Sequence, residues 1–331
     1  MSEGASSHHP ISEPHRSAAI DAASSRLAGR RREDHIVSAS AASQRAIERA
    51  MLASRSELPV LIWGPPGSGR SMLARAIHAW SGNAAGSLET LVCAAVPEPL
   101  QIRALFGCAA GNYPGLPEAY VGAFERASGG TLLIEGIEGL GAPVATALAR
   151  ALATGRYRPE GGSEDRPLRA RIVATADRAT GQPLGEGGLS VELPPLAERR
   201  EDVLPLAAHF LALAAAEAGV APIGFAPDAR AALLEEPWLG NVTELRERVR
   251  QAVRLSGGGA VSAEALLLAA PGGRVPSFRE AKRAFEARYV QSLLRLCEGN
   301  ISQAARLAQK DRKDFYDVIR RTGIDPAQYR R

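Results

Sequence analysis

The sequence predicts an α/β fold in which helices cover a parallel sheet, followed by an all-helical region and a separate all-α unit. Between about residues 35 and 199, short apolar runs alternate with helical patterns, which is typical of parallel sheets. From 200 to 270 the pattern is helical throughout, and residues 271–277 are rich in glycine and proline. We therefore expect a core at 35–199, a helical region at 200–270, a linker at 271–277 and an α-helical unit at 278–331.

The strongest local pattern in the core is the apolar run Val60–Trp63, which leads through a glycine-rich turn into the helical stretch Met72–Ile77. A strand, a turn of the composition GPPGSGRS and a helix together form a P-loop. Further strands are expected at the apolar runs Leu91–Cys93, Thr131–Ile134 and Arg171–Ala174.

The glycine-rich turn supplies the candidate nucleotide-binding residues. Its glycines leave room for backbone N–H groups to wrap phosphate oxygens, and the helix N-terminus behind it adds positive potential. Arg70 stands where a P-loop has lysine, so the charge is kept on a bulkier, planar group. The candidate phosphate ligands are Gly64, Gly67, Ser68, Gly69, Arg70 and Ser71, and the Ser71 hydroxyl is the candidate Mg²⁺ ligand.

Composition places the chain among globular proteins of a reducing compartment. The 331 residues, 45% of them hydrophobic, suffice for more than one domain, and no apolar run has the length of a membrane span or a signal-peptide core. Residues 1–34 lack apolar periodicity and are expected to be a disordered tail. The cysteines Cys93, Cys108 and Cys297 match no metal spacing and are expected to be buried thiols, so we expect a cytoplasmic protein.

The positive charge of the chain is concentrated at its C-terminal end. Residues 277–331 hold 13 Lys and Arg against 7 Asp and Glu, a net charge of +6, while the remainder carries −2. Such a distribution is typical of a protein with an anionic partner at that end. A solvated helical surface would explain the same charge equally well.

Several longer segments carry a specific resemblance. In order and spacing over residues 35–331 they resemble the AAA+ domain of sigma-54-dependent transcriptional activators, the bacterial enhancer-binding proteins; the segments are Leu105–Gly107, Gly122–Leu132, Leu193–Asp202 and Pro237–Arg246. The resemblance implies an AAA+ P-loop core, a helical lid over 200–270, a C-terminal Fis-type helix-turn-helix and ATP with Mg²⁺ as cofactor. The regulatory N-terminal domain common in that family is not expected in a tail as short as residues 1–34.

The chain departs from the family at the acidic motif that supports hydrolysis. In this motif the expected strand Thr131–Ile134 is followed by Glu135 instead of the Mg²⁺-binding Asp. Gly136 stands where a water-activating Glu is expected. Glu135 remains the second candidate Mg²⁺ ligand. Glu138, two residues beyond Gly136, is expected to point elsewhere.

Further departures affect the residues that sense and stabilise the γ-phosphate. Ala176-Asp177 replaces a Thr-Asn pair, the segment 181–188 contains no arginine finger, and Thr243 stands at the lid sensor arginine. Each such arginine is worth about three to five orders of magnitude in rate in related systems. We therefore expect negligible hydrolysis and a weak or structural role for ATP, which weighs against an enzyme without deciding the question.

The polymerase-contacting loop of the family is also changed. Residues 111–116 keep an aromatic side chain as Tyr113, but Pro114 replaces a threonine and so removes a hydroxyl and a backbone donor. This departure counts against contact with sigma-54 polymerase.

The last 54 residues have the pattern of a helix-turn-helix. A first helix carries an apolar stripe, a second spans Ile301–Leu307 after the cap Asn300, and a third begins after Asp311, with Asp314 at the capping-box position. Gly323 is expected to end the third helix. The stripe, expected to be either an internal core or the seam of a dimer, consists of Phe278, Phe285, Tyr289, Leu293 and Leu296.

The string Gly299–Arg306 resembles the Fis-type domain, which implies binding to double-stranded DNA as a dimer. Basic side chains of the last helix would face the major groove or its phosphates. The candidate DNA-binding residues, each of which has an ordinary solvated charge or hydroxyl as its alternative interpretation, are Ser302, Lys310, Arg312, Lys313, Tyr316, Arg320 and Arg321.

The sequence favours a sequence-specific DNA-binding transcriptional regulator on a sigma-54-activator scaffold that does not hydrolyse ATP. We expect a homo-oligomer, either a dimer through the C-terminal unit or a higher ring. Two alternatives stay open: an active ATP-hydrolysing activator, and an inhibitory subunit that inserts into the ring of a related activator.

Overall fold

The computed structural model describes residues 36–113, 117–179, 184, 187–220, 224–269 and 277–329. The predicted tail, the predicted linker up to residue 276, and parts of the segments 111–116 and 181–188 lie outside these ranges. The chain divides into two compact units between residues 37 and 38, and the second unit, Ser38–Arg331, contains all the helices and strands described.

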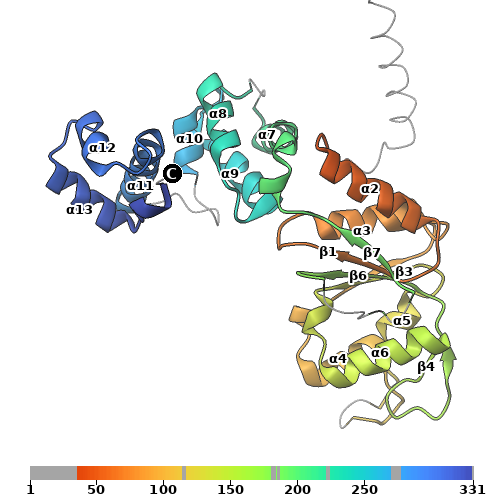
Figure 1. The fold of residues 1–331 in the computed structure, drawn as a ribbon. Helices are drawn as coiled ribbons and strands as arrows, with labels where there is room; N and C mark the ends of the chain where they lie inside the picture. Colours follow the sequence, from red (N-terminus) through yellow and green to blue (C-terminus); the bar gives the residue numbers. More distant parts are fainter. Residues whose placement is uncertain are drawn as a thin grey trace, which may run out of the picture. The chain divides into compact units, whose positions relative to one another are not determined.

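A parallel sheet forms the centre of the core, as predicted, and it has five strands (Figure 1). The strands are β1 Val60–Trp63, β2 Leu88–Val92, β3 Thr131–Glu135, β6 Arg171–Ala176 and β7 Leu189–Glu192. Their order across the sheet is β2-β3-β6-β1-β7, so the P-loop strand lies inside the sheet between β6 and β7. Strands β3 and β6 are buried almost throughout, because helices cover both faces.

Two layers of helices enclose this sheet. Figure 1 shows α2 (Ala41–Ser54) and α3 (Arg70–Ala79) on one face and α4 (Glu98–Phe106), α5 (Ala123–Arg126) and α6 (Ala142–Thr154) on the other. A short antiparallel pair, β4 (Arg156–Tyr157) and β5 (Arg166–Pro167), follows α6.

The core on the second face is built around aromatic rings. Phe106 and Phe124 lie edge to face with ring centroids 5.1 Å apart, and Tyr157 packs against Phe124 at the same distance. All three cysteines are buried and unpaired, as predicted.

Helices α7 (Val203–Ala218), α8 (Pro227–Glu235), α9 (Asn241–Leu255) and α10 (Ala263–Leu268) follow the sheet. All four lie in the region 200–270 that the sequence predicts to be helical, whereas the edge strand β7 was not predicted. Trp238 and Leu245 are buried in this region. The guanidinium of Arg248 lies over the Trp238 ring and pairs with Glu236 and Glu244, so this buried charge is neutralised on two sides.

The C-terminal unit contains α11 (Phe278–Leu296), α12 (Ile301–Leu307) and α13 (Arg312–Thr322) around a core of its own. The side chain of Asn300 caps α12 by accepting from Gln303 N at 3.2 Å, and Gly323 ends α13 with a φ of 74°, both as predicted. Asp311 stands at the N-cap of α13, but the predicted side-chain cap is wrong, because the Asp311 side chain makes no capping hydrogen bond.

The apolar stripe of α11 is not the core of this unit. Val290, Leu294 and Cys297, each one residue beyond a member of the stripe, are buried against α12 and α13 instead. Leu293 is partly buried, but the other four members are 41–85% exposed: Phe278, Phe285, Tyr289 and Leu296. Of the two interpretations left open by the sequence, the internal core is therefore excluded for those four.

Among the helices that the structure describes, none is both long enough and apolar enough to cross a membrane.

Candidate functional site

The P-loop lies at the carboxyl edge of the sheet, where the backbone leaves no room for side chains. A Cβ atom on Gly64 would lie 2.1 Å from the carbonyl oxygen of Leu193, and one on Gly67 would lie 2.4 Å from that of Gly240. Glycine is thus required at both positions by close approach of neighbouring backbone. Within the loop the Ser68 hydroxyl is buried and has no hydrogen-bond partner among the described residues.

Arg70, the first residue of α3, forms an ion pair with Asp177. Its Nη2 lies 2.7 Å from Asp177 Oδ1, and the side chains of Arg70 and Asp177 are 14% and 48% exposed. The other terminal nitrogen, Nη1, is buried and has no partner within the described part of the chain. The two departures from the family pattern, at the P-loop cation and at the sensor, therefore contact each other.

Parallel register brings acidic residues to the same edge. Glu135 ends β3 opposite Thr175 of β6, and its Oε1 is buried without a partner among residues that the structure places. Gly136 donates its backbone N–H to the Thr175 hydroxyl at 3.2 Å. The sequence correctly marks this position as lacking a carboxylate.

Glu138 was expected to point away from the phosphate edge, but its side chain points toward Asp177. Its Oε1 accepts a hydrogen bond of 2.9 Å from the backbone N–H of Asp177. The short helix Ile137–Gly139 turns the chain back toward β6, which the linear spacing does not reveal. Glu138 thereby adds a carboxylate next to Asp177 at the same edge of the sheet as Glu135.

The start of α9 rests directly on the P-loop. Asn241 donates from Nδ2 to the Pro66 carbonyl at 2.9 Å and accepts at Oδ1 from Leu196 N at 2.8 Å. Thr243, at the position of the sensor arginine, donates its backbone N–H to the Gly67 carbonyl at 3.2 Å. Sequence reasoning noted Thr243 but missed Asn241, whose φ of 56° is unusual for a residue other than glycine.

On its other side the P-loop is tied to a buried polar junction. Arg199 donates from Nη2 to the Ser68 carbonyl at 2.6 Å and from Nη1 to the Ser43 hydroxyl at 3.1 Å. Its Nη1 lies 3.8 Å from Asp202 Oδ2. Burial lowers the pKa of Arg199, an effect opposed by the nearby Asp202 carboxylate.

Asp202 is completely buried and holds the start of α2. Oδ1 accepts from the backbone N–H of Ala39 at 2.6 Å and of Ser40 at 2.7 Å, and Oδ2 accepts from the hydroxyls of Ser40 and Ser43. Burial alone would raise the pKa of Asp202, but these hydrogen bonds outweigh it and hold the pKa below its ordinary value. The spacing Arg199-x-x-Asp202 is the signal that would have marked this junction.

The polar atoms at the phosphate edge fit a nucleotide with a divalent cation. Ser68 Oγ and Arg70 Nη1 are buried donors without partners, which suits phosphate oxygens, and Glu135 Oε1 is a buried acceptor, which suits Mg²⁺. Buried polar groups without partners are costly, so unused groups of this kind indicate a ligand. Ser71 lies on the first turn of α3, beside Arg70.

The loop that corresponds to the polymerase-contacting loop is fastened at its aromatic residue. Tyr113 donates its hydroxyl to Glu160 Oε2 at 2.6 Å, and the Arg103 guanidinium lies 5.0 Å from the Tyr113 ring centroid. Arg103 also lies 5.5 Å from the ring centroid of Tyr120. Pro114 lies outside the described residues.

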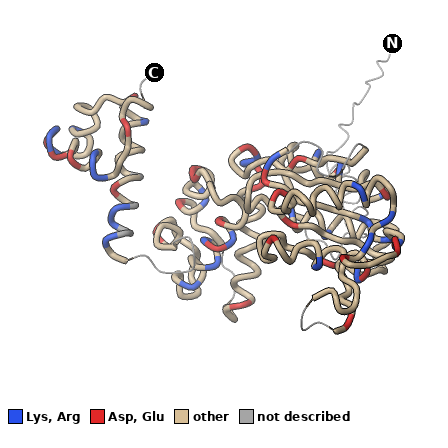
Figure 2. Tube along the Cα trace, turned by 90° about the horizontal axis from the view of Figure 1, so that it is seen from below, with Lys and Arg blue, Asp and Glu red and all other residues tan. Residues whose placement is uncertain are grey.

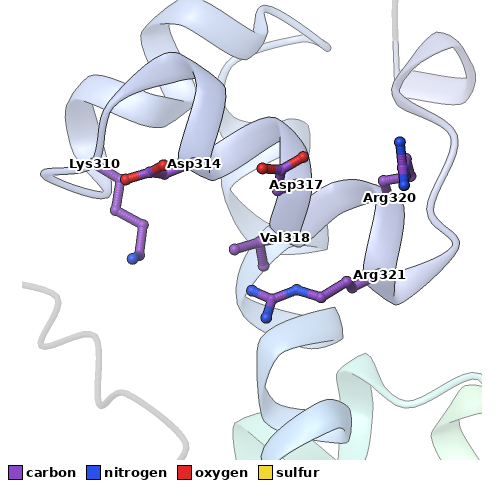
Figure 3. A pocket seen from close by; sticks show the side chains of 6 residues that line it. All are labelled: Lys310, Asp314, Asp317, Val318, Arg320 and Arg321. Atoms are coloured by element: carbon purple, nitrogen blue, oxygen red, sulfur yellow. The ribbon is translucent and has the colours of Figure 1, made fainter.

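The candidate DNA-binding residues lie on the surface of the C-terminal unit. Apart from the half-buried Ser302, they are exposed: Lys310, Arg312, Lys313, Tyr316, Arg320 and Arg321. Figure 2 shows basic positions along α11 and on the helices that follow it. Acidic residues accompany them, since the hollow drawn in Figure 3 is lined by Lys310, Asp314, Asp317, Val318, Arg320 and Arg321.

The parallel sheet, the P-loop and the helical region on the loop define the class: an AAA+ P-loop domain with its lid. Residues 36–193 match the sigma-54 interaction domain, and residues 197–275 match the AAA+ ATPase lid domain. The chain belongs to the family of transcriptional regulatory proteins that carry the sigma-54 interaction domain.

Relatives of known name agree with this assignment. GlrR, a transcriptional regulatory protein of Escherichia coli K12, is 33% identical over 309 aligned residues, which cover 89% of this chain and 69% of GlrR. DctD of Rhizobium meliloti, a regulator of C4-dicarboxylate transport, is 31% identical over 285 residues, covering 83% of this chain and 61% of DctD. The crystal structure of NtrX from Brucella abortus in complex with ADP has a TM-score of 0.64 and 26% identity, covering 95% of this chain and 77% of NtrX.

Proposed function

We propose that the chain is a sequence-specific DNA-binding transcriptional regulator whose P-loop holds nucleotide without hydrolysing it. The observation that carries the proposal is the contrast between Arg70, paired inside the chain with Asp177, and the exposed basic side chains of α13. The family's scaffold and its C-terminal helices persist, while the groups needed for hydrolysis are replaced.

The C-terminal unit supports DNA binding by its packing. Phe315, Val318 and Ile319 of α13 are buried against the other two helices, so the opposite face of α13 is turned to solvent. That face carries Lys313 and Arg320, with Tyr316 at its margin. A short, stably packed helix with cations on its outer face is the element that a helix-turn-helix places in the major groove.

The phosphate edge supports nucleotide retention without turnover. Gly136 offers no carboxylate to activate water, and Glu138, the nearest alternative, is committed to the Asp177 backbone N–H. Ser68, Arg70 and Glu135 nevertheless present unpaired buried polar atoms, which suit a bound phosphate chain and Mg²⁺. NtrX has been crystallised with both ATP and ADP.

The exposed face of α11 and the loop around Tyr113 bear on the partners of the chain. The exposed part of the α11 stripe, in which the Phe285 and Tyr289 rings stack at 6.1 Å, is proposed as the seam of a dimer. Contact with sigma-54 polymerase is not part of the proposal, because the Tyr113 hydroxyl is hydrogen-bonded to Glu160 and the ring lies under the Arg103 guanidinium.

The test measures binding of the full chain to a mixed-sequence duplex of about 30 base pairs by fluorescence anisotropy over a series of salt concentrations. We expect salt-sensitive binding, and the double variant Arg312→Ala/Arg320→Ala is expected to weaken it about ten-fold or more and to reduce the salt slope by about 2. The matched control is Arg279→Ala/Arg283→Ala, which removes the same charge from exposed positions of α11.

Equal losses in the two double variants would contradict a specific role for α13, and absence of salt-sensitive binding would contradict DNA binding altogether. The same preparation is assayed for ATP turnover at concentrations that favour rings, where we expect none above background. Turnover that disappears in Ser71→Ala would show instead an active ATPase.

A further inference from the structure

Of the two terminal nitrogens of the Arg70 guanidinium, one has a partner among the described residues and one has none. Nη2 is 2.7 Å from Asp177 Oδ1, whereas Nη1 is buried and has no partner among the described residues. A guanidinium presents its donors as a rigid fork, so the two nitrogens address different neighbours at the same time. One half of the P-loop cation is therefore satisfied by the chain itself, and the other half is available to a ligand.

The neutralising carboxylate comes from a position that faces the end of a phosphate chain. The P-loop cation is the group that reaches the β- and γ-phosphates. Asp177 directly follows β6, the strand beside the P-loop strand, where Trp63 pairs with Ala176. A carboxylate there competes for the same cation as the last phosphate of a triphosphate.

The local charge strengthens this competition. Glu135 at the end of β3 and Glu138, hydrogen-bonded to Asp177 N at 2.9 Å, add two carboxylates to that of Asp177. Arg70 is paired with one of these three carboxylates. Each further negative charge on a ligand is therefore repelled at this edge more strongly than in water.

We propose that Asp177 is an internal substitute for the third phosphate, so that the P-loop takes a nucleoside diphosphate in preference to a triphosphate. This inference rests on the proposed function, in which the P-loop holds nucleotide without hydrolysing it. A diphosphate uses the P-loop backbone, Ser68 Oγ and Arg70 Nη1 and leaves the Arg70–Asp177 pair closed. A triphosphate must break that pair or meet its carboxylate.

The proposal has a regulatory consequence. A site that holds the diphosphate in preference to the triphosphate does not report the presence of ATP. Asp177 would thus keep the core in one nucleotide state, and the chain would act on DNA without a nucleotide cycle.

The experiment is calorimetric titration of the full chain with ADP and with ATP, each with Mg²⁺ and with a chelator. The wild-type chain is expected to bind ADP at least about ten-fold more tightly than ATP. Asp177→Asn removes the charge and keeps the shape, so it is expected to strengthen ATP binding about ten-fold and to change ADP binding less than about three-fold.

The matched control is Asp165→Asn. Asp165 also pairs with an arginine, Arg158, at 2.7 Å and is 44% exposed, close to the 48% of Asp177, but it lies on the segment between β4 and β5. This variant is expected to leave both affinities unchanged. Thermal unfolding of every variant checks that the core is folded, and Asp177→Ala replaces Asp177→Asn if the latter is not.

The possible failures are distinguishable. Equal affinities of the wild-type chain for ADP and ATP, or an equal gain for both in Asp177→Asn, would overturn the role of Asp177 while nucleotide binding stands. Absence of binding by either nucleotide would overturn this inference together with the nucleotide half of the proposed function. The DNA-binding half is decided separately by the anisotropy measurement.

Discussion

Arg199 donates a hydrogen bond to the P-loop and Arg70 belongs to it, and the two arginines differ in what surrounds them. Arg199 is buried, donates to the Ser68 carbonyl and the Ser43 hydroxyl, and lies beside the fully buried Asp202. Arg70 is at the phosphate edge, pairs with the half-exposed Asp177 and keeps Nη1 without a partner in the described structure. The first arginine connects elements of the fold, while the second belongs to a site with unused donors.

The difference shows which contacts the fold depends on. The Arg199–Asp202 junction lies in a segment that resembles the family and joins the start of α2, the P-loop and the start of α7. Arg70 and Asp177 both depart from the family pattern, and the carboxylate of their ion pair is half exposed. A family scaffold is thus kept while its chemistry at the neighbouring edge is altered.

The largest effect is expected from Asp202→Asn. The new amide keeps the shape but turns an NH₂ group toward the hydroxyl and backbone donors of α2, and it leaves Arg199 as a buried charge without a counter-ion. Breaking a buried pair in this way costs about 3–5 kcal/mol of unfolding free energy. Chemical denaturation followed by tryptophan fluorescence measures the loss, since Trp63 lies on β1.

Asp165→Asn is the matched control for this variant, because the Asp165–Arg158 pair is about half exposed. It is expected to cost much less unfolding free energy than Asp202→Asn, because solvent screens an exposed ion pair. If the two variants had equal costs, the junction would be no more important to the fold than a surface pair.

A smaller effect is expected in the pH dependence of the stability difference between the wild-type chain and Asp202→Asn. The folded pKa of Asp202 lies below its ordinary value of about 3.9, so the unfolded chain takes up the proton first. The stabilisation is complete above the ordinary pKa and is lost as the pH falls through the folded pKa. The gap in unfolding midpoint between the wild-type chain and Asp202→Asn should therefore narrow from pH 7 to pH 3.

A gap that stays constant down to pH 3 would show that the charge of Asp202 contributes nothing and that the amide acts only through its altered hydrogen bonds. Asp165, whose pKa is also lowered by its hydrogen bond from Arg158, is present in both chains and so cancels in the difference.

The smallest effect on stability is expected at the phosphate edge. Asp177→Asn removes a half-exposed ion pair, which contributes about 1 kcal/mol or less because solvent screens it. The same denaturation measurement provides the value. A cost as large as that of Asp202→Asn would make Arg70–Asp177 a structural pair and would remove the contrast between the two arginines.

Much of the architecture is predictable from local patterns. Val60–Trp63 forms β1 within the predicted bounds, and Ile301–Leu307 forms α12, because apolar periodicity and caps act over a few residues. The edge strand β7 is missed because only Val191 of its four residues is buried, so it lacks an apolar run. Helix α10 lies in the region predicted to be helical, but its bounds are not predictable because six residues are too few for a clear period.

The sequence alone determined the fold class, the P-loop and the list of altered residues, including Arg70, Gly136 and Asp177. Only the tertiary structure decided that Arg70 and Asp177 pair, that Glu138 turns back toward them, and that Asn241 rests on the loop. The reason is physical: local patterns depend on neighbours in the chain, whereas these contacts depend on β6 lying between β3 and β1 and on where α9 begins. Parallel strand order joins residues far apart in the chain, and no local pattern encodes it.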